Sequence, residues 1–172
     1  YAGIVESWAQ LGSDINGEST YDYSGHSVSL SSDGSVVAIG AYGNDGGGNA
    51  SGHVRIYENN NGTWTQIGSD IDGEASGDNS GYSESGSAVS LSGDGSVVAI
   101  GAFANDGGGS NSGHVRLYKN NNGTWTQIGS DIDGEGSSDY FGWSVSLSSD
   151  GSVVAIGANQ NDGGGTYSGH VR

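Results

Sequence analysis

The fold of this chain is decided by the segment Ser35-Val36-Val37-Ala38-Ile39-Gly40-Ala41, which recurs unchanged at residues 96–102 and 152–158. β-Branched and small apolar residues follow one another without a break, a pattern typical of a strand that is covered on both faces. The preceding segment Val89-Ser90-Leu91 alternates apolar and polar residues, and Asp94-Gly95 is a strong hairpin signal between the two runs. No stretch has helical periodicity, so the sequence predicts an all-β fold.

The neighbouring segments recur together with this strand. Ser-Gly-His-Val-Arg occurs at residues 51–55, 112–116 and 168–172, and the sequence around Trp64 returns around Trp125 and, more loosely, around Trp8. Self-similarity at such a period is typical of stacked repeat architectures. Cutting the chain before each Tyr that follows His-Val-Arg gives three units, at residues 1–56, 57–117 and 118–172.

Each unit reads as four short antiparallel strands, which fits one blade of a β-propeller. Closed propellers have about 4 to 8 blades, so three units point to further blades from neighbouring chains or flanking repeats, or to a β-prism of three sheets as the alternative. The chain opens near residues 7–14 with the fourth strand of a unit and stops after the third strand of another. We therefore expect strands to be shared across unit boundaries and exchanged between copies.

Composition excludes several classes of protein. Twenty Asp and Glu residues face four Lys and Arg, and the formal net charge of −16 repels nucleic acid and anionic membrane surfaces. No apolar run approaches the roughly 20 residues of a membrane helix, and the absence of Cys removes disulfides and thiolate sites. The 35 Gly residues fall mainly in recurring turns, so the apolar residues stay clustered in the strands.

The segment Phe141-Gly142-Trp143-Ser144-Val145-Ser146-Leu147, followed by Val153 to Ala158, resembles the FG-GAP repeat of integrin-α-like β-propellers. The resemblance covers the two central strands of each unit. The departures from the family are Ser24-Gly25 and Ser85-Gly86 in place of Phe-Gly, and Tyr42, Phe103 and Asn159 in place of the closing Pro. The Ser-Asp-Gly turn and the His-Val-Arg-Ile-Tyr strand also look like parts of a WD-repeat blade. Both resemblances imply a propeller blade, and neither implies catalysis.

An acidic loop after each Trp segment is the candidate metal site. Oxygen-bearing side chains stand at relative positions 1, 3, 5 and 9 of this loop in all three units, positions that EF-hand loops also use for calcium. They are Asp14, Asn16, Glu18 and Asp22, then Asp70, Asp72, Glu74 and Asp78, and finally Asp131, Asp133, Glu135 and Asp139. The alternative is a solvated acidic turn whose Asp side chains cap backbone amides. The calcium loop that the FG-GAP resemblance implies has no room in its usual hairpin, which is only Ser32-Asp33-Gly34.

Three other recurring features have simpler interpretations. The Asn-Asp-Gly-Gly-Gly segment at residues 44–48 predicts a turn rather than an anion site. One His opens a strand in each unit, and without ligands at close spacing it is expected to make a structural hydrogen bond rather than to hold zinc; these residues are His53, His114 and His170. The repeated Trp residues are expected to cover neighbouring blades, with sugar stacking as the alternative; these are Trp8, Trp64 and Trp125.

Three near-identical units favour equivalent binding or packing surfaces over a single asymmetric catalytic site. The sequence therefore predicts a non-enzymatic structural or adhesive module that self-assembles into a ring or filament. Its expected partners are other copies, flanking repeats and glycans, and its expected ion is calcium. A carbohydrate-binding, lectin-like module is the alternative. N-glycosylation sequons begin at Asn49, Asn61 and Asn122 and, together with the acidity, favour an extracellular or cell-surface location.

Overall fold

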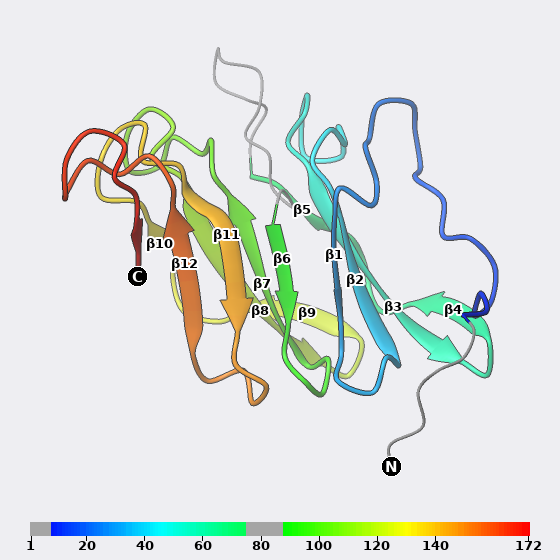
Figure 1. Ribbon diagram of the computed structural model, residues 1–172. Coiled ribbons are helices and arrows are strands. Elements are labelled where there is room, and N and C mark those ends of the chain that lie inside the picture. The colour runs from blue at the N-terminus through cyan, green and yellow to red at the C-terminus, as the bar shows by residue number, and fades with distance from the viewer. Residues whose placement is uncertain (1–7, 75–87) are drawn as a thin grey trace.

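The computed structural model describes residues 8–74 and 88–172, which form three antiparallel sheets arranged in a row (Figure 1). The first sheet contains β1 (Ser27–Leu30), β2 (Val36–Ala41), β3 (His53–Asn60), β4 (Thr63–Gln66) and β5 (Ile71–Asp72). The second contains β6 (Ala88–Leu91), β7 (Val97–Ala102), β8 (His114–Asn121), β9 (Thr124–Gln127) and β10 (Ile132–Asp133). The third contains β11 (Phe141–Leu147), β12 (Val154–Ala158) and β13 (His170–Val171). Nowhere in these ranges is there a helix long and apolar enough to cross a bilayer.

Each of the first two sheets has four strand positions, and the fourth position is broken. Both β4 and β5 pair with β3, with Gln66 opposite Tyr57 and Ile71 opposite Val54. The chain leaves the ladder between them at Gly68, whose φ of 73° is a conformation that glycine adopts at little cost. The second sheet repeats this arrangement with β9 and β10 on β8. The predicted all-β fold of four-stranded, propeller-like blades is thus confirmed.

The sheets stack face to face, and the middle one is covered on both sides. β6 packs against β1 and β2, and β11 packs against β6, β7 and β8. Within β7, Val98 and Ile100 belong to the apolar cluster shared with the first sheet, whereas Ala99 belongs to the cluster shared with the third. This two-sided burial explains why the strand is an unbroken apolar run. It favours propeller-like blades over the β-prism alternative, in which each sheet turns one face to a common core.

The first strands of neighbouring sheets are tied together by serine side chains and turn backbones. The Ser29 hydroxyl accepts a hydrogen bond of 2.9 Å from the Leu91 amide, and the Ser90 hydroxyl accepts the equivalent 2.9 Å bond from Leu147. The hairpin turns continue the series, because the Gly93 carbonyl accepts from Ser32 N while Gly93 N donates to the Ser149 carbonyl. The three sheets therefore meet in register at their first strands and first hairpins.

The expectation of an N-terminal fourth strand is wrong for the described residues 8–14, which lie outside any strand. A strand exists only through its partner, and β4 and β9 pair with the third strand of their own sheet. Residues 8–14 have no such neighbour among the described residues. The segment still occupies the repeat position, because Leu11 O accepts a hydrogen bond from Trp64 Nε1 just as Ile67 O accepts one from Trp125 Nε1.

Candidate metal centre

Each acidic loop precedes a sheet, and an arginine at the third strand of that sheet holds the loop in place. Arg116 on β8 places its NH1 3.2 Å from Glu74 Oε1, and its NH2 donates a 3.3 Å hydrogen bond to the backbone carbonyl of Asp72. Arg55 on β3 makes the same pair of contacts, with Glu18 Oε1 at 3.6 Å and the Asn16 carbonyl at 2.8 Å. The contacts tie position 3 and position 5 of the loop to the third strand of a blade.

The third copy has the same arrangement. Arg172 NH1 lies 3.1 Å from Glu135 Oε1, and its NH2 donates a 2.8 Å hydrogen bond to the Asp133 carbonyl. These arginines are not among the site residues predicted from the sequence. Their signal was present in the repeated His-Val-Arg segment, in which Arg stands two residues after His on the same face of a strand.

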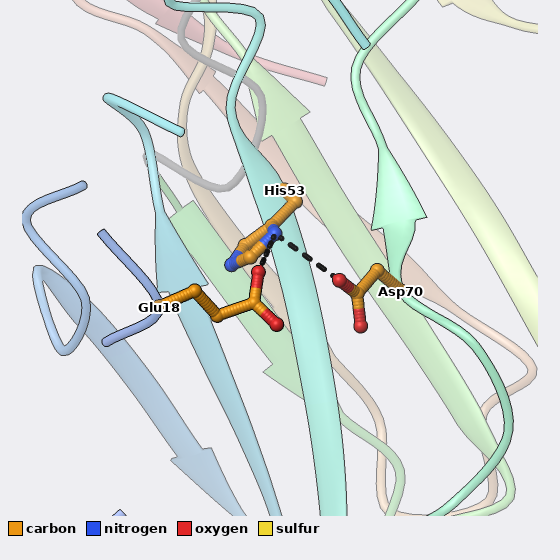
Figure 2. A group of neighbouring side chains, drawn as sticks. All are labelled: Glu18, His53 and Asp70. Atoms are coloured by element: carbon orange, nitrogen blue, oxygen red, sulfur yellow. Dashed lines mark ion pairs between the residues drawn. The ribbon is translucent and has the colours of Figure 1, made fainter. Parts of the chain in front are cut away.

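His53, the first residue of β3, is buried beside the contact between Arg55 and Glu18. The side chain of His53 is 1% exposed, and its Nδ1 lies 3.6 Å from Asp70 Oδ2 and 3.9 Å from Glu18 Oε2 (Figure 2). Both separations exceed hydrogen-bond length, and neither ring nitrogen of His53 has a hydrogen-bond partner. The expectation of a structural hydrogen bond is therefore wrong for His53. Its carboxylate neighbours were missed because Glu18 comes from the loop before this sheet and Asp70 from the segment between β4 and β5.

The same cluster is built a second time, one blade further along. His114 is buried at the start of β8, with Asp131 Oδ2 3.7 Å from its Nδ1. Glu74 completes this group, and in both groups one ligand atom from each of the three residues lies within 4.8 Å of the others. These acidic and histidine groups can each hold a metal ion. His170 differs, because it is partly exposed and Glu135 Oε2 lies 4.0 Å from its Nδ1.

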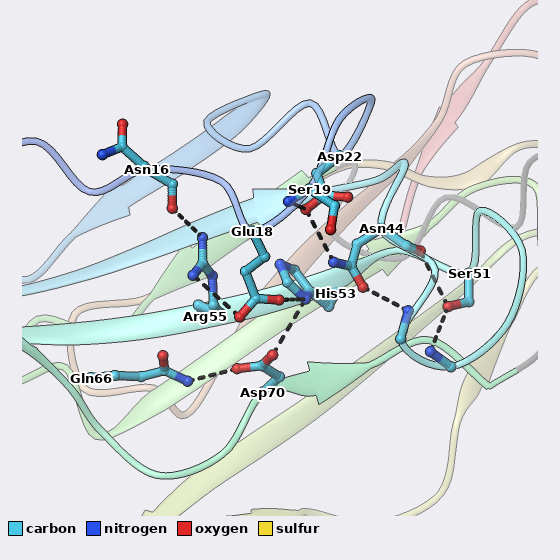
Figure 3. Close-up of polar contacts among 12 residues, drawn as sticks. Asn16, Glu18, Ser19, Asp22, Asn44, Ser51, His53, Arg55, Gln66 and Asp70 are labelled. Atoms are coloured by element: carbon cyan, nitrogen blue, oxygen red, sulfur yellow. Dashed lines mark hydrogen bonds and ion pairs between the residues drawn. The ribbon is translucent and has the colours of Figure 1, made fainter.

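Neighbouring side chains orient the two carboxylates of each group. Arg55 engages Glu18 Oε1, and Gln66 Nε2 donates a 2.6 Å hydrogen bond to Asp70 Oδ1 (Figure 3). In each carboxylate the other oxygen is the one that faces His53. In the second group Arg116 holds Glu74 Oε1, while Gln127 Nε2 donates a 2.6 Å bond to Asp131 Oδ1. Each cluster thus presents two oriented oxygens and one imidazole nitrogen.

Burial keeps the imidazoles neutral. Loss of hydration lowers the pKa of His53, against the opposing influence of the Asp70 carboxylate. Burial also lowers the pKa of His114, and the positive charge of Arg116 lowers it further. A neutral imidazole has a nitrogen lone pair, which is what a metal ligand requires.

Within the described residues, the oxygen-bearing side chains of a single acidic loop do not converge on one common point. Positions 5 and 1 of successive loops meet at a histidine, and position 3 binds arginine through its backbone carbonyl. Position 9 is engaged elsewhere: Asp22 Oδ2 accepts hydrogen bonds from Ser19 N and Asn44 Nδ2, and Asp139 Oδ2 accepts one from Asn161 Nδ2. The remaining predicted ligand, Asp78, lies outside the described residues.

Carboxylates from two successive loops do share one hollow, whose volume is about 310 Å³. Its acidic lining residues are Glu18, Asp22, Asp45, Asp70 and Asp72. Glu18 and Asp70 are therefore members of both the hollow and the His53 group. The loop that contributes Asp45 is a turn as predicted, because the Asn44 side chain accepts a hydrogen bond from Gly46 N and Asp45 accepts one from Ala50 N.

The other predicted site residues lie at the surface or between blades. All three sequon asparagines are exposed, and two of them sit at the β3–β4 and β8–β9 turns with positive φ; the residues are Asn49, Asn61 and Asn122. Trp125 packs against the apolar cluster between the first and second sheets, as expected of a side chain that covers a neighbouring blade. Trp8 is exposed.

Part of the chain matches a known repeat family. The FG-GAP repeat pattern matches residues 16–57 and 130–171. The first matched segment begins in an acidic loop and ends within β3, so it includes Glu18, His53 and Arg55. The second includes Glu135 and His170 and ends with β13. No curated protein matches the chain.

Proposed function

We propose that this chain, which carries FG-GAP repeats, is a non-enzymatic structural or adhesive module whose propeller-like blades stack on further blades outside the cell or at its surface. The observation that carries the proposal is the apolar character of the two outer sheet faces. On β1, Val28 and Leu30 are 64% and 59% exposed, whereas their repeat equivalents Val89 and Leu91 are 9% and 6% exposed at the junction of the first two sheets.

The opposite face of the third sheet repeats the pattern. Val153 and Val171 are 64% and 74% exposed, while their equivalents Val97 and Val115 are 8% and 0% exposed against the neighbouring sheet. The exposed face of the first sheet thus corresponds to the face that the second sheet turns toward the first. The exposed face of the third sheet corresponds to the face that the second sheet turns toward the third. Such head-to-tail complementarity produces rings or filaments, and it supports self-assembly or stacking on flanking repeats.

A mixing experiment tests this proposal. One variant carries Val28→Lys and Leu30→Lys, the other carries Val153→Lys and Val171→Lys, and Thr63→Lys is the surface control. By analytical ultracentrifugation the wild type and the control should associate with rising concentration, each face variant should stay monomeric, and the two face variants together should stop at dimers. A wild type that remains monomeric at every concentration would refute stacking between copies.

Calcium and glycans are the finer parts of the proposal. Five carboxylates around one hollow support a calcium ion there, and the exposure of the sequon asparagines supports glycosylation. Millimolar calcium should raise the melting temperature and chelator should lower it, by mass action on the folded state. Enzymatic deglycosylation of the secreted protein should lower its mass. Unchanged melting and unchanged mass would remove the two parts respectively.

Carbohydrate binding is the second candidate function, and a pair of equivalent grooves supports it. One groove is lined by Trp125, Tyr118 and Asp70, and its equivalent is lined by Trp64, Tyr57 and Asp14. An aromatic side chain beside a carboxylate suits a sugar ring and its hydroxyls. A glycan array on the wild type should then show binding that Trp64→Ala weakens. An array without hits would leave the structural role alone.

A further inference from the structure

We propose that the two buried histidine clusters each bind one divalent transition-metal ion of the Zn²⁺ class. One site consists of His53, Glu18 and Asp70, and the other of His114, Glu74 and Asp131. The inference is independent of the stacking role proposed above, because it concerns atoms inside the chain rather than its outer faces.

The unpartnered imidazole of His53 distinguishes the first cluster from an acidic surface patch, and the second cluster repeats its three residue types one blade further along. His53 is almost fully buried, and neither ring nitrogen has a hydrogen-bond partner. A buried polar group without a partner is costly and calls for a specific explanation. Its Nδ1 faces two carboxylate oxygens that lie too far away for hydrogen bonds and close enough to share an ion with it.

The separations fit a small ion. Zn²⁺ binds N and O ligands at about 2.0–2.1 Å, which places tetrahedral ligands about 3.3 Å apart. The His53 nitrogen is 3.6 Å from the Asp70 oxygen and 3.9 Å from the Glu18 oxygen, so contractions of a few tenths of an ångström bring them to that spacing. Three protein ligands leave the fourth position to water, and the adjoining acidic hollow offers room for it.

The surroundings already hold the ligands in place. Arg55 and Gln66 each bind one oxygen of a carboxylate and leave the other oxygen toward His53. Such outer contacts are what orient carboxylates in metal sites. The second cluster repeats them with Arg116 and Gln127. A divalent ion balances the two carboxylate charges that the fold brings together around each imidazole.

The nitrogen donor determines the class of metal. Calcium takes six to eight oxygen ligands, whereas imidazole with carboxylate suits zinc and its neighbours in the transition series. The third repeat offers an internal comparison, because His170 has Glu135 beside it but no second carboxylate in a metal-binding group among the described residues. Binding at His53 and His114 but not at His170 is therefore the expected pattern.

Metal titration of the chelator-stripped chain tests the proposal. Calorimetry with Zn²⁺, and metal analysis after gel filtration, should give two ions per chain. His53→Gln and His114→Gln should each leave one ion, the double variant none, and the control His170→Gln two. Asp70→Asn should weaken the first site at least tenfold, whereas Glu58→Asn, a change of an exposed acid on β3, should leave both sites intact.

A spectroscopic readout keeps the proposal falsifiable if a histidine variant is poorly folded. Co²⁺ added to the wild type should give the intense visible absorption of a four-coordinate site, and Asp70→Asn should reduce it by about half. Excess calcium should not displace Zn²⁺. Zn²⁺ binding that survives the double histidine change, or that calcium displaces at equal concentration, would show that only the acidic surface binds and would overturn the proposal.

Discussion

Replacing Phe141 by Ala should separate the third blade from the second. The Phe141 side chain is fully buried at the start of β11, in the apolar cluster with Ala99 and Val115 of the second sheet. The Arg172 guanidinium carbon lies 4.4 Å from the centre of its ring, and the ring of His170 meets it edge-on. No other aromatic side chain belongs to either described apolar cluster as a fully buried member.

The expected loss follows from this burial. Truncating a buried Phe to Ala costs about 3–5 kcal/mol, and at this chain length about 1 kcal/mol shifts the melting temperature by roughly 2–4 °C. We therefore expect the melting temperature of Phe141→Ala to lie about 10 °C below that of the wild type. Because repeat units contact only their neighbours, protection from hydrogen exchange should fall most in β12 and β13 and least in β2.

Trp143 supplies the control, since it lies on the same strand but is half exposed and packs against Phe103. Trp143→Ala should cost about 1 kcal/mol. Calorimetry and native-state hydrogen exchange on both variants measure the difference. If Phe141→Ala melts no lower than Trp143→Ala, or if β2 loses as much protection as β12, the ring does not anchor the third blade to the second.

Three further perturbations test the turns and the blade junctions. Hydrogen bonds from Ser35 lower the pKa of Asp33 to about 2, and those from Ser148 and Ser152 lower the pKa of Asp150 to about 2. Because these folded pKa values lie below the usual 3.8, the stabilisation is present above pH 4 and is lost as pH falls toward 2. Carbon-detected NMR titration should show that Ser148→Ala raises the pKa of Asp150 but not that of Asp33. A Cβ at Gly93 would meet the hydroxyls of Ser32 and Ser149, so Gly93→Ala should destabilise the chain by about 1–3 kcal/mol in denaturant unfolding. Adding Ser149→Ala should restore part of this stability. An unchanged stability of Gly93→Ala would mean that the stacked turns are loosely packed. Arg116→Met removes the contacts with Glu74 and the Asp72 carbonyl and should lower the free energy of unfolding by about 1–3 kcal/mol. Lys119→Met, on the exposed end of β8, should leave it nearly unchanged. Equal losses of stability in the two variants would show that the Arg116 contact adds nothing.

The strands could be predicted from the sequence because their burial is written in local patterns. The unbroken apolar run at residues 97–102 is β7 itself, and the Asp94-Gly95 turn before it closes as the hairpin signal implies. The break in the fourth strand was harder to foresee. Gly68 looks like an ordinary member of a strand until its positive φ shows the chain leaving and rejoining β3.

Residues 8–14 show the limit of pattern reading for strands. This segment resembles β4 and β9 in sequence, yet it forms no strand, because a strand needs a pairing partner and no described strand pairs with it. Sequence similarity did locate the segment correctly, since Leu11 makes the tryptophan contact that Ile67 makes one repeat later. The place of a segment in the repeat can be read from its own residues, whereas strand pairing also depends on a second segment.

The metal cluster escaped prediction for a related reason. Spacing rules for metal loops look for ligands within one short segment, and the oxygen positions of each acidic loop were grouped on that basis. In the structure, Glu18 of one loop and Asp70 of the next face the same histidine. The pairing of β5 with β3 brings Asp70 beside His53, and the loop before β1 supplies Glu18.

The distribution of charge leaves an unbalanced carboxylate beside each of the two buried histidines. Three of the four Lys and Arg residues in the chain are the junction arginines Arg55, Arg116 and Arg172, and each neutralises the glutamate of one acidic loop. The next loop adds an aspartate to the same place, Asp70 in one case and Asp131 in the other, with a neutral imidazole rather than a cation beside it. One arginine cannot balance both carboxylates. The divalent ion proposed above would supply the missing positive charge beside each buried histidine.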